Sequence, residues 1–225
     1  MRNDLHVHYS ASLYDHYSRH GVEGFDLLTT ARVLNEVRQR APGALLDVGT
    51  GTGVLPIKLA QRVECAQWRI VGTDFFEDMI AICESNRAEA PGGSQLDFLH
   101  DDVHAMRFSD ASFDIVLARS NVHHWRDPVL AFREIFRVLS PGGVAIVHEP
   151  RRDSNPEALA SFNESRATLG VEPSRVEEKF STKELKGFLE NAGIAEHSTV
   201  SAPERGIASL GVEILIRKPG RALDA

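Results

Sequence analysis

A glycine-rich turn is the feature of this sequence whose residue types and spacing most clearly predict chemistry. Asp47-Val48-Gly49-Thr50-Gly51-Thr52-Gly53 closes a short apolar run that begins at Ala44. Glycines in such a turn let the backbone approach a ligand with no Cβ in the way. Asp74 ends the next apolar run, where a carboxylate can accept hydrogen bonds from a ribose diol. Together the turn and Asp74 predict a nucleoside-binding site.

The spacing of the glycines separates two classes of nucleoside site. A dinucleotide fingerprint reads G-x-G-x-x-G, and its third glycine allows the helix to pack closely. Counted from Gly49, the sixth position is Val54, so the fingerprint fails while G-x-G-x-G is present. The spacing therefore disfavours a nicotinamide oxidoreductase. Taken alone, the glycines leave a plain structural turn as the alternative.

Alternating strands and helices are expected to position this turn. Apolar runs bounded by turn residues predict strands, and Asp127-Pro128 predicts a helix start with an acidic N-cap. Ser181 and Glu184 form a capping-box pattern for a helix that ends at Gly193. Such alternation predicts a parallel sheet covered on both faces. The predicted strands are 44–48, 69–73, 96–100, 113–118 and 144–148, followed by an antiparallel hairpin of 196–202 and 207–217.

Composition narrows the class of protein. With 225 residues and a net charge of −7, the chain is expected to lack a large basic surface for nucleic acid. No apolar run approaches the roughly 18 residues that span a bilayer, and residues 1–10 lack the apolar stretch of a secretory signal. Cys65 and Cys83 have no metal-ligand spacing, so no metal site is predicted. We expect a soluble, cytoplasmic protein, monomeric or homodimeric, that acts on a small molecule.

Five segments in order along the chain resemble the motifs of one enzyme family: 45–53, 71–74, 101–103, 113–128 and 137–143. Their order and spacing are similar to those of the class I S-adenosyl-L-methionine-dependent methyltransferases, and within them the ubiquinone/menaquinone-biosynthesis type. The resemblance implies an α/β fold with a Rossmann-like, doubly wound, seven-stranded and mostly parallel sheet whose last strand is antiparallel. It implies a domain over 41–218, with lids formed by N-terminal helices in 1–40 and a helical insertion at 151–180. We expect the tail at 219–225 to be disordered.

The same resemblance places the cofactor at the carboxyl ends of the strands. Gly49 and Gly51 are implied to face its methionyl and ribose parts, and Asp74 its ribose, although Asp74 could instead cap the following helix. Phe75 could flank the adenine or simply pack, and either Asp101 or Asp102 could meet the adenine amino group. Arg119 enters by its position after the fourth strand, where the family uses mostly backbone atoms. The implied cofactor-binding residues are Asp47, Gly49, Thr50, Gly51, Asp74, Phe75, Asp102, Val103 and Arg119.

The acceptor side is less determined by the sequence. His124 could contact the substrate or act as a general base, because imidazole titrates near neutral pH, or it could be a hydrogen-bonded loop residue. Glu149 could be a base, a substrate anchor or a solvated carboxylate. Arg151 could bind an anionic acceptor through paired hydrogen bonds. Tyr14 and Tyr17 could close over the cofactor and exclude water, or pack on the domain.

The resemblance implies an in-line displacement that moves a methyl group from S-adenosylmethionine to a small-molecule nucleophile and leaves S-adenosylhomocysteine. Two alternatives stay open. One is a protein or RNA methyltransferase, although Arg119-Ser120-Asn121-Val122 does not match the N/D-P-P-Y/F pattern of many base and glutamine methylating enzymes. The other is a cofactor-binding member that does not methylate.

Overall fold

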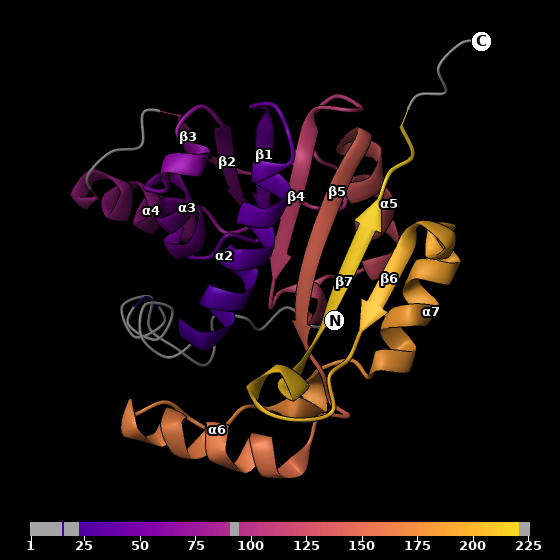
Figure 1. Cartoon of the computed structure of the whole chain (residues 1–225). Coiled ribbons are helices and arrows are strands. Elements are labelled where there is room, and N and C mark those ends of the chain that lie inside the picture. Colours follow the sequence, from indigo (N-terminus) through magenta and orange to yellow (C-terminus); the bar gives the residue numbers. More distant parts are fainter. Residues whose placement is uncertain (1–14, 16–22, 91–94, 221–225) are drawn as a thin grey trace.

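Seven strands form one sheet in the computed structural model, which describes residue 15 and residues 23–90 and 95–220. The strand order is β3-β2-β1-β4-β5-β7-β6 (Figure 1). In the described chain only β7 runs antiparallel to its neighbours, which confirms the predicted doubly wound sheet. The strands are β1 (Ala44–Val48), β2 (Arg69–Asp74), β3 (Leu96–His100), β4 (Phe113–Arg119), β5 (Leu139–Pro150), β6 (Ser198–Ser201) and β7 (Gly211–Arg217).

Helices cover both faces of the sheet (Figure 1). On one face lie α2 (Glu23–Arg38), α3 (Val54–Ala60) and α4 (Glu77–Glu89), and on the other α5 (Pro128–Val138) and α7 (Thr182–Ala192). A further helix, α6 (Pro156–Thr168), lies beyond the carboxyl ends of β4 and β5. The 3-10 turns are η2 (Val63–Cys65), η3 (Val122–His124), η4 (Val176–Glu178), η5 (Ala195–His197) and η6 (Ile207–Leu210).

The central strands are apolar throughout because helices cover both of their faces. Successive side chains of a strand point to opposite faces, so Leu45 packs with α2 and α3 while Leu46 packs with α5 and α7. Both leucines are fully buried. This double burial holds β1 in register with β2 and β4, and so fixes where the glycine-rich turn begins.

Local capping signals end and begin the helices where the sequence predicts. The Asp127 side chain accepts from the Leu130 N–H at 3.0 Å, and Pro128 opens α5. Ser181 and Glu184 form the predicted capping box at the start of α7, and Gly193 ends that helix with a φ of 76°. These contacts depend on residues within four positions of one another, so the sequence alone carries them.

One strand boundary differs from the prediction. The predicted strand 207–217 begins only at Gly211, because 207–210 forms a 3-10 turn in which the Ser209 hydroxyl donates to the Gly206 carbonyl at 2.6 Å. On α2, the apolar Leu27 is 65% exposed. The buried face of α2 instead runs through Asp26, Thr29 and Val33, one to two helical turns apart.

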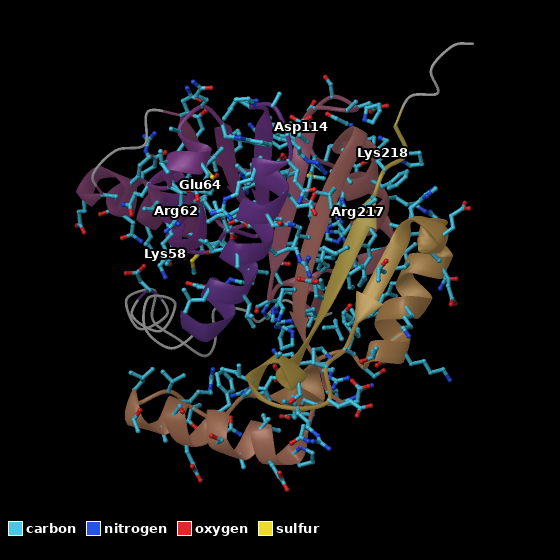
Figure 2. The ribbon with its side chains drawn as sticks, viewed as in Figure 1. Lys58, Arg62, Glu64, Asp114, Arg217 and Lys218 are labelled. Atoms are coloured by element: carbon cyan, nitrogen blue, oxygen red, sulfur yellow. The ribbon has the colours of Figure 1, made fainter. Side chains whose placement is uncertain are left out.

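Cys65 and Cys83 are both buried free thiols. Within the described residues, no helix is long and apolar enough to cross a membrane. Charged side chains cover the surface on both sides of the sheet, and Asp114, Arg217 and Lys218 lie together at the amino edge of the parallel strands (Figure 2). The opposite edge, at the carboxyl ends of the parallel strands, carries the glycine-rich turn, Asp74 at the end of β2 and Arg119 at the end of β4.

Candidate functional site

The glycine-rich turn leaves β1 in a conformation that only glycine adopts easily at three positions. Gly49, Gly51 and Gly53 have φ values of 65°, 59° and 75°. A Cβ on Gly49 would lie 2.3 Å from the Asn121 side-chain nitrogen, and one on Gly53 would lie 2.7 Å from the Phe98 ring. The glycines are therefore required both by backbone angle and by close packing. The Thr50 N–H donates to the Thr73 carbonyl at 2.8 Å and ties the turn to β2.

Asp74 joins the end of β2 to this turn. Its carboxylate accepts from the Gly51 N–H at 2.8 Å and from the Phe76 N–H at 3.1 Å. Burial raises the pKa of the Asp74 carboxyl, and the backbone N–H donors oppose that shift. The alternative role as helix cap is wrong, because Phe76 is the N-cap of α4 and no side chain caps that helix. Asp74 instead joins the end of β2 to the glycine-rich turn through the Gly51 N–H.

Asp47 lies at the end of β1 under the same turn. The Thr50 hydroxyl donates to it at 2.6 Å, and burial raises the pKa of this carboxyl to about 7. A pocket opens between the turn, the start of α3 and the end of β4. Its lining residues are Asp47, Gly49, Thr50, Thr52, Val54, Leu55 and Arg119. Four of the nine predicted cofactor residues therefore line one pocket.

Arg119 reaches this pocket with a partner that the sequence did not reveal. Its guanidinium forms an ion pair of 3.3 Å with Asp26 on α2, and Asp26 also accepts from Lys58 on α3 at 2.8 Å. Lys58 lies on the side of the sheet that α2 and α3 cover (Figure 2). The missed signal was helical spacing, since Asp26 lies three and seven residues before the buried Thr29 and Val33.

The residues expected to meet the adenine lie at and just after the ends of β2 and β3. Phe75 is 57% exposed, and its ring centroid lies 5.4 Å from that of Phe76 and 6.2 Å from that of His100, so the structure is compatible with simple packing and with a place beside the adenine. Its carbonyl lies 2.8 Å from the His100 ring nitrogen. Asp102 accepts from the His104 N–H at 2.9 Å through one oxygen. The other oxygen of Asp102 has a distant ion pair with Arg126, at 3.8 Å, and Val103 packs partly on the core.

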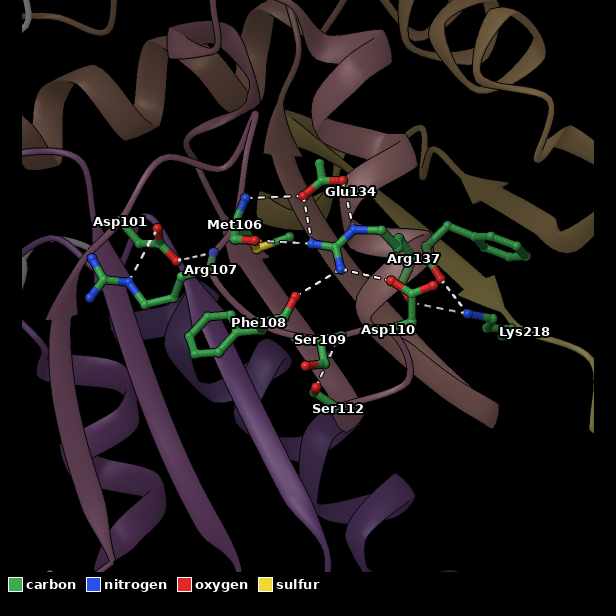
Figure 3. A network of polar contacts seen from close by, with 11 residues as sticks. Asp101, Met106, Arg107, Phe108, Ser109, Asp110, Ser112, Glu134, Arg137 and Lys218 are labelled. Atoms are coloured by element: carbon green, nitrogen blue, oxygen red, sulfur yellow. Dashed lines mark hydrogen bonds and ion pairs between the residues drawn. The ribbon is translucent and has the colours of Figure 1, made fainter.

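Arg137 holds the segment that follows Asp101 and Asp102 (Figure 3). Its guanidinium donates to the carbonyls of Met106 and Phe108 at 3.0 and 2.7 Å. It also forms a two-pronged pair with Glu134, which in turn accepts from the Met106 N–H at 3.0 Å. The arginine of the 137–143 motif thus fixes the loop between β3 and β4 from α5.

On the acceptor side, Glu149 is a buried anchor and not a solvated loop carboxylate. It is fully buried in β5 and accepts from the Val122 and His123 N–H groups at 3.1 and 3.2 Å. One of its oxygens also lies 2.5 Å from the His123 ring nitrogen. Burial raises the pKa of the Glu149 carboxyl to about 8. Glu149 therefore holds η3, and its ring partner is His123, the neighbour of the predicted site residue His124.

His124 follows on the same turn, with its ring 3.8 Å from that of His123. Burial and the neighbouring charges lower the pKa of His124 to about 2, so the imidazole stays neutral near pH 7. A base with so low a pKa takes up a proton weakly, so the low pKa of His124 favours contact with a substrate over general-base chemistry. Lys179, which no motif singled out, lies near enough to lower the pKa of both His124 and Glu149.

Arg151 has a position that favours a structural role. It is 8% exposed and donates to the carbonyls of Ser209 and Pro203 at 3.0 and 2.8 Å. Tyr14 and Tyr17 lie outside the described residues. Among the residues that the structure describes, no group of three or more His, Cys, Asp or Glu side chains is placed to hold a metal ion.

Comparison with known proteins identifies a methyltransferase domain in this chain. Residues 46–147 match a family described as "Methyltransferase domain". The chain is 37% identical over 139 residues to a demethylmenaquinone methyltransferase of Thermus thermophilus, covering 62% of this chain and 61% of the relative. It is 30% identical over 144 residues to the O-methyltransferase rstn1 of Aspergillus nomiae, covering 61% and 63%. The chain thus spans about three-fifths of the length of these curated relatives.

A solved structure shares the whole fold. A SAM-dependent methyltransferase from Aquifex aeolicus is similar with a TM-score of 0.70 at 17% identity, over 93% of this chain and 98% of that one. At this identity the likeness concerns the fold.

Proposed function

Because this chain belongs to the class I S-adenosyl-L-methionine-dependent methyltransferase family, we propose that it transfers a methyl group from S-adenosylmethionine to a small molecule. The observation that carries the proposal is the hydrogen bond from the Gly51 N–H to the Asp74 carboxylate. It holds a buried carboxylate beside a turn in which a Cβ on Gly49 or Gly53 would clash with a neighbouring side chain. When bound, S-adenosylmethionine supplies a methyl group on a sulfonium that is already activated for transfer.

The residues at the carboxyl edge fit this cofactor. Asp74 would accept from the ribose hydroxyls, and the exposed Phe75 ring would lie against the adenine. Asp102, with one oxygen not engaged by His104, would accept from the adenine amino group, and Val103 would lie beside the ring. Asp47, Thr50 and Gly51 would shape the turn around the ribose and methionyl parts. Since the methyl donor is activated, the protein's main task is to align the acceptor and exclude water.

Glu149 would serve the acceptor indirectly, and His124 would serve it by contact. Glu149 would position the turn after β4 through its three interactions with residues 122 and 123. His124, neutral and next along that turn, would contact the acceptor. The acceptor named for the Thermus relative, demethylmenaquinone, is a small molecule, and the net charge of −7 argues against a nucleic-acid acceptor.

Calorimetry with S-adenosylmethionine, S-adenosylhomocysteine and NAD tests the cofactor. We expect both sulfur nucleosides to bind and NAD not to bind. Asp74→Ala should reduce their affinity at least tenfold, since it removes hydrogen bonds to a charged group. The matched control is Asp97→Ala, which removes an exposed carboxylate from the neighbouring β3. Binding of neither sulfur nucleoside would refute the proposal.

The acceptor class is tested by following the labelled methyl group. The protein is incubated with methyl-labelled cofactor and, in separate reactions, a small-metabolite extract, total protein and total RNA. Label in the metabolite fraction is the expected result. Label that precipitates with protein or RNA would make this a macromolecular methyltransferase instead, and binding without any transfer would indicate a non-methylating member.

A further inference from the structure

Arg119 contributes a cationic side chain to the pocket beside the glycine-rich turn. The turn itself needs no charged side chain at this place. It is the last residue of β4, and it lines the pocket opposite Gly49 and Thr50. Its side chain is only 16% exposed. A guanidinium that is mostly buried needs partners for its five N–H donors.

The contacts that the structure gives Arg119 do not use these donors fully. In the described part of the chain its side chain has one ion pair, with Asp26 at 3.3 Å. The Asp26 oxygen on that side is buried and accepts no hydrogen bond from a described residue. The other Asp26 oxygen is held by Lys58 at 2.8 Å. Asp26 therefore attracts Arg119 without using all five of its N–H donors, and the Arg119 side chain lines the pocket.

The pocket thus combines a fixed cation with a turn that exposes backbone to a ligand. Two carboxylates compensate the positive charge of Arg119, because Asp26 is buried beside it and Asp47 lines the same pocket. A neutral zwitterion brings one carboxylate to such a cation without changing the net charge. The amino-acid end of S-adenosylmethionine carries that chemistry, and a guanidinium binds a carboxylate through two parallel hydrogen bonds.

We propose that Arg119 binds the α-carboxylate at the amino-acid end of the cofactor, with Asp26 as the residue that positions its guanidinium. This inference rests on the proposed function and assigns the recognition of that end to a side chain. It makes Arg119 a specificity residue that separates nucleosides with an amino-acid end from those without one. The alternative is that Arg119 only neutralises the buried carboxylates around it.

A pair of ligands separates these two roles. S-adenosylhomocysteine carries the amino-acid end, whereas 5′-methylthioadenosine has the same adenosine and thioether sulfur without it. Calorimetry would compare both ligands on wild-type protein and on Arg119→Gln, Arg119→Lys and Asp26→Asn. The matched control is Arg69→Gln, which removes an exposed arginine from the amino end of β2.

Arg119→Gln should weaken S-adenosylhomocysteine about ten- to hundredfold, as expected for a lost charge-assisted pair, and change 5′-methylthioadenosine less than about twofold. Arg119→Lys should lie between, because an ammonium keeps the charge and loses the fork. Asp26→Asn should weaken S-adenosylhomocysteine by a smaller factor and spare the other ligand. Arg69→Gln should change neither.

Two results with Arg119→Gln would overturn the inference. One is an equal loss of affinity for both ligands, which indicates a structural role, and the other is unchanged affinity for both. If Arg119→Gln does not fold, Arg119→Lys decides the matter: wild-type affinity for both ligands, or an equal loss of both, counts against the inference. If the wild-type protein binds neither ligand, both the proposed function and this inference are refuted. If the protein prefers S-adenosylhomocysteine and the Arg119 variants keep that preference, only this inference is refuted.

Discussion

Replacement of Glu149 by glutamine should change how the stability of the protein depends on pH. Glu149 is fully buried, and burial raises the pKa of its carboxyl from 4.5 to about 8. Between these two values the folded protein holds a proton that the unfolded chain releases. The contribution to the free energy of unfolding is therefore fully present below pH 4.5 and is lost as the pH rises through about 8.

The size of this effect follows from the pKa difference. At about 1.4 kcal/mol per pH unit, the shift from 4.5 to about 8 corresponds to roughly 5 kcal/mol. Glu149→Gln cannot titrate, so the wild-type free energy of unfolding minus that of the variant should fall by several kcal/mol between pH 5 and 8.5. The variant should also be less stable at pH 5, because its side-chain NH₂ would face one of the donors of residues 122 and 123.

Urea unfolding at several pH values measures this difference. The fluorescence of Trp68 and Trp125, both buried, reports the loss of packing. Buried groups that do not interact with Glu149, such as Asp47, titrate in both proteins and cancel in the difference. Glu196→Gln is the matched control, since that side chain is 81% exposed, and its difference from wild type should not vary with pH. A flat difference for Glu149→Gln would show that its donors outweigh burial and keep the carboxylate charged.

Three further perturbations test the site. Gly49→Ala should lower the free energy of unfolding by about 1–3 kcal/mol and weaken S-adenosylhomocysteine at least tenfold, because the residue has a φ of 65° and its Cβ would meet Asn121. Gly187→Ala, in α7 with no atom within 4 Å of a new Cβ, is the control, and equal effects would contradict the steric argument. Arg137→Lys should cost about 1–3 kcal/mol in urea unfolding and loosen the loop between β3 and β4, seen as faster amide exchange at 106–110; unchanged exchange there would contradict its role. His124→Gln should keep the pH profile of methyl transfer between pH 6 and 8 and change mainly KM, since His124 is already neutral there; a lost pH limb would instead make it the base.

The fold and most of the cofactor edge could be predicted because their signals are local. The G-x-G-x-G turn, the Asp127 cap and the capping box at Ser181 each depend on residues a few positions apart. The apolar runs of the central strands follow from their double burial, and Asp74 follows from its place at the end of β2. These features need no knowledge of which distant segments meet.

What only the tertiary structure decided are the partners of charged residues far apart in the chain. The sequence does not tell whether Glu149 faces solvent or the core, because a single polar residue at the end of an apolar strand is compatible with both. It is β5, enclosed between β4 and β7, that buries Glu149 against η3 and gives it His123. In the same way, α2 must cross the sheet before Asp26 can meet Arg119. Local periodicity determines the elements, whereas the burial and pairing of charges depend on how those elements pack.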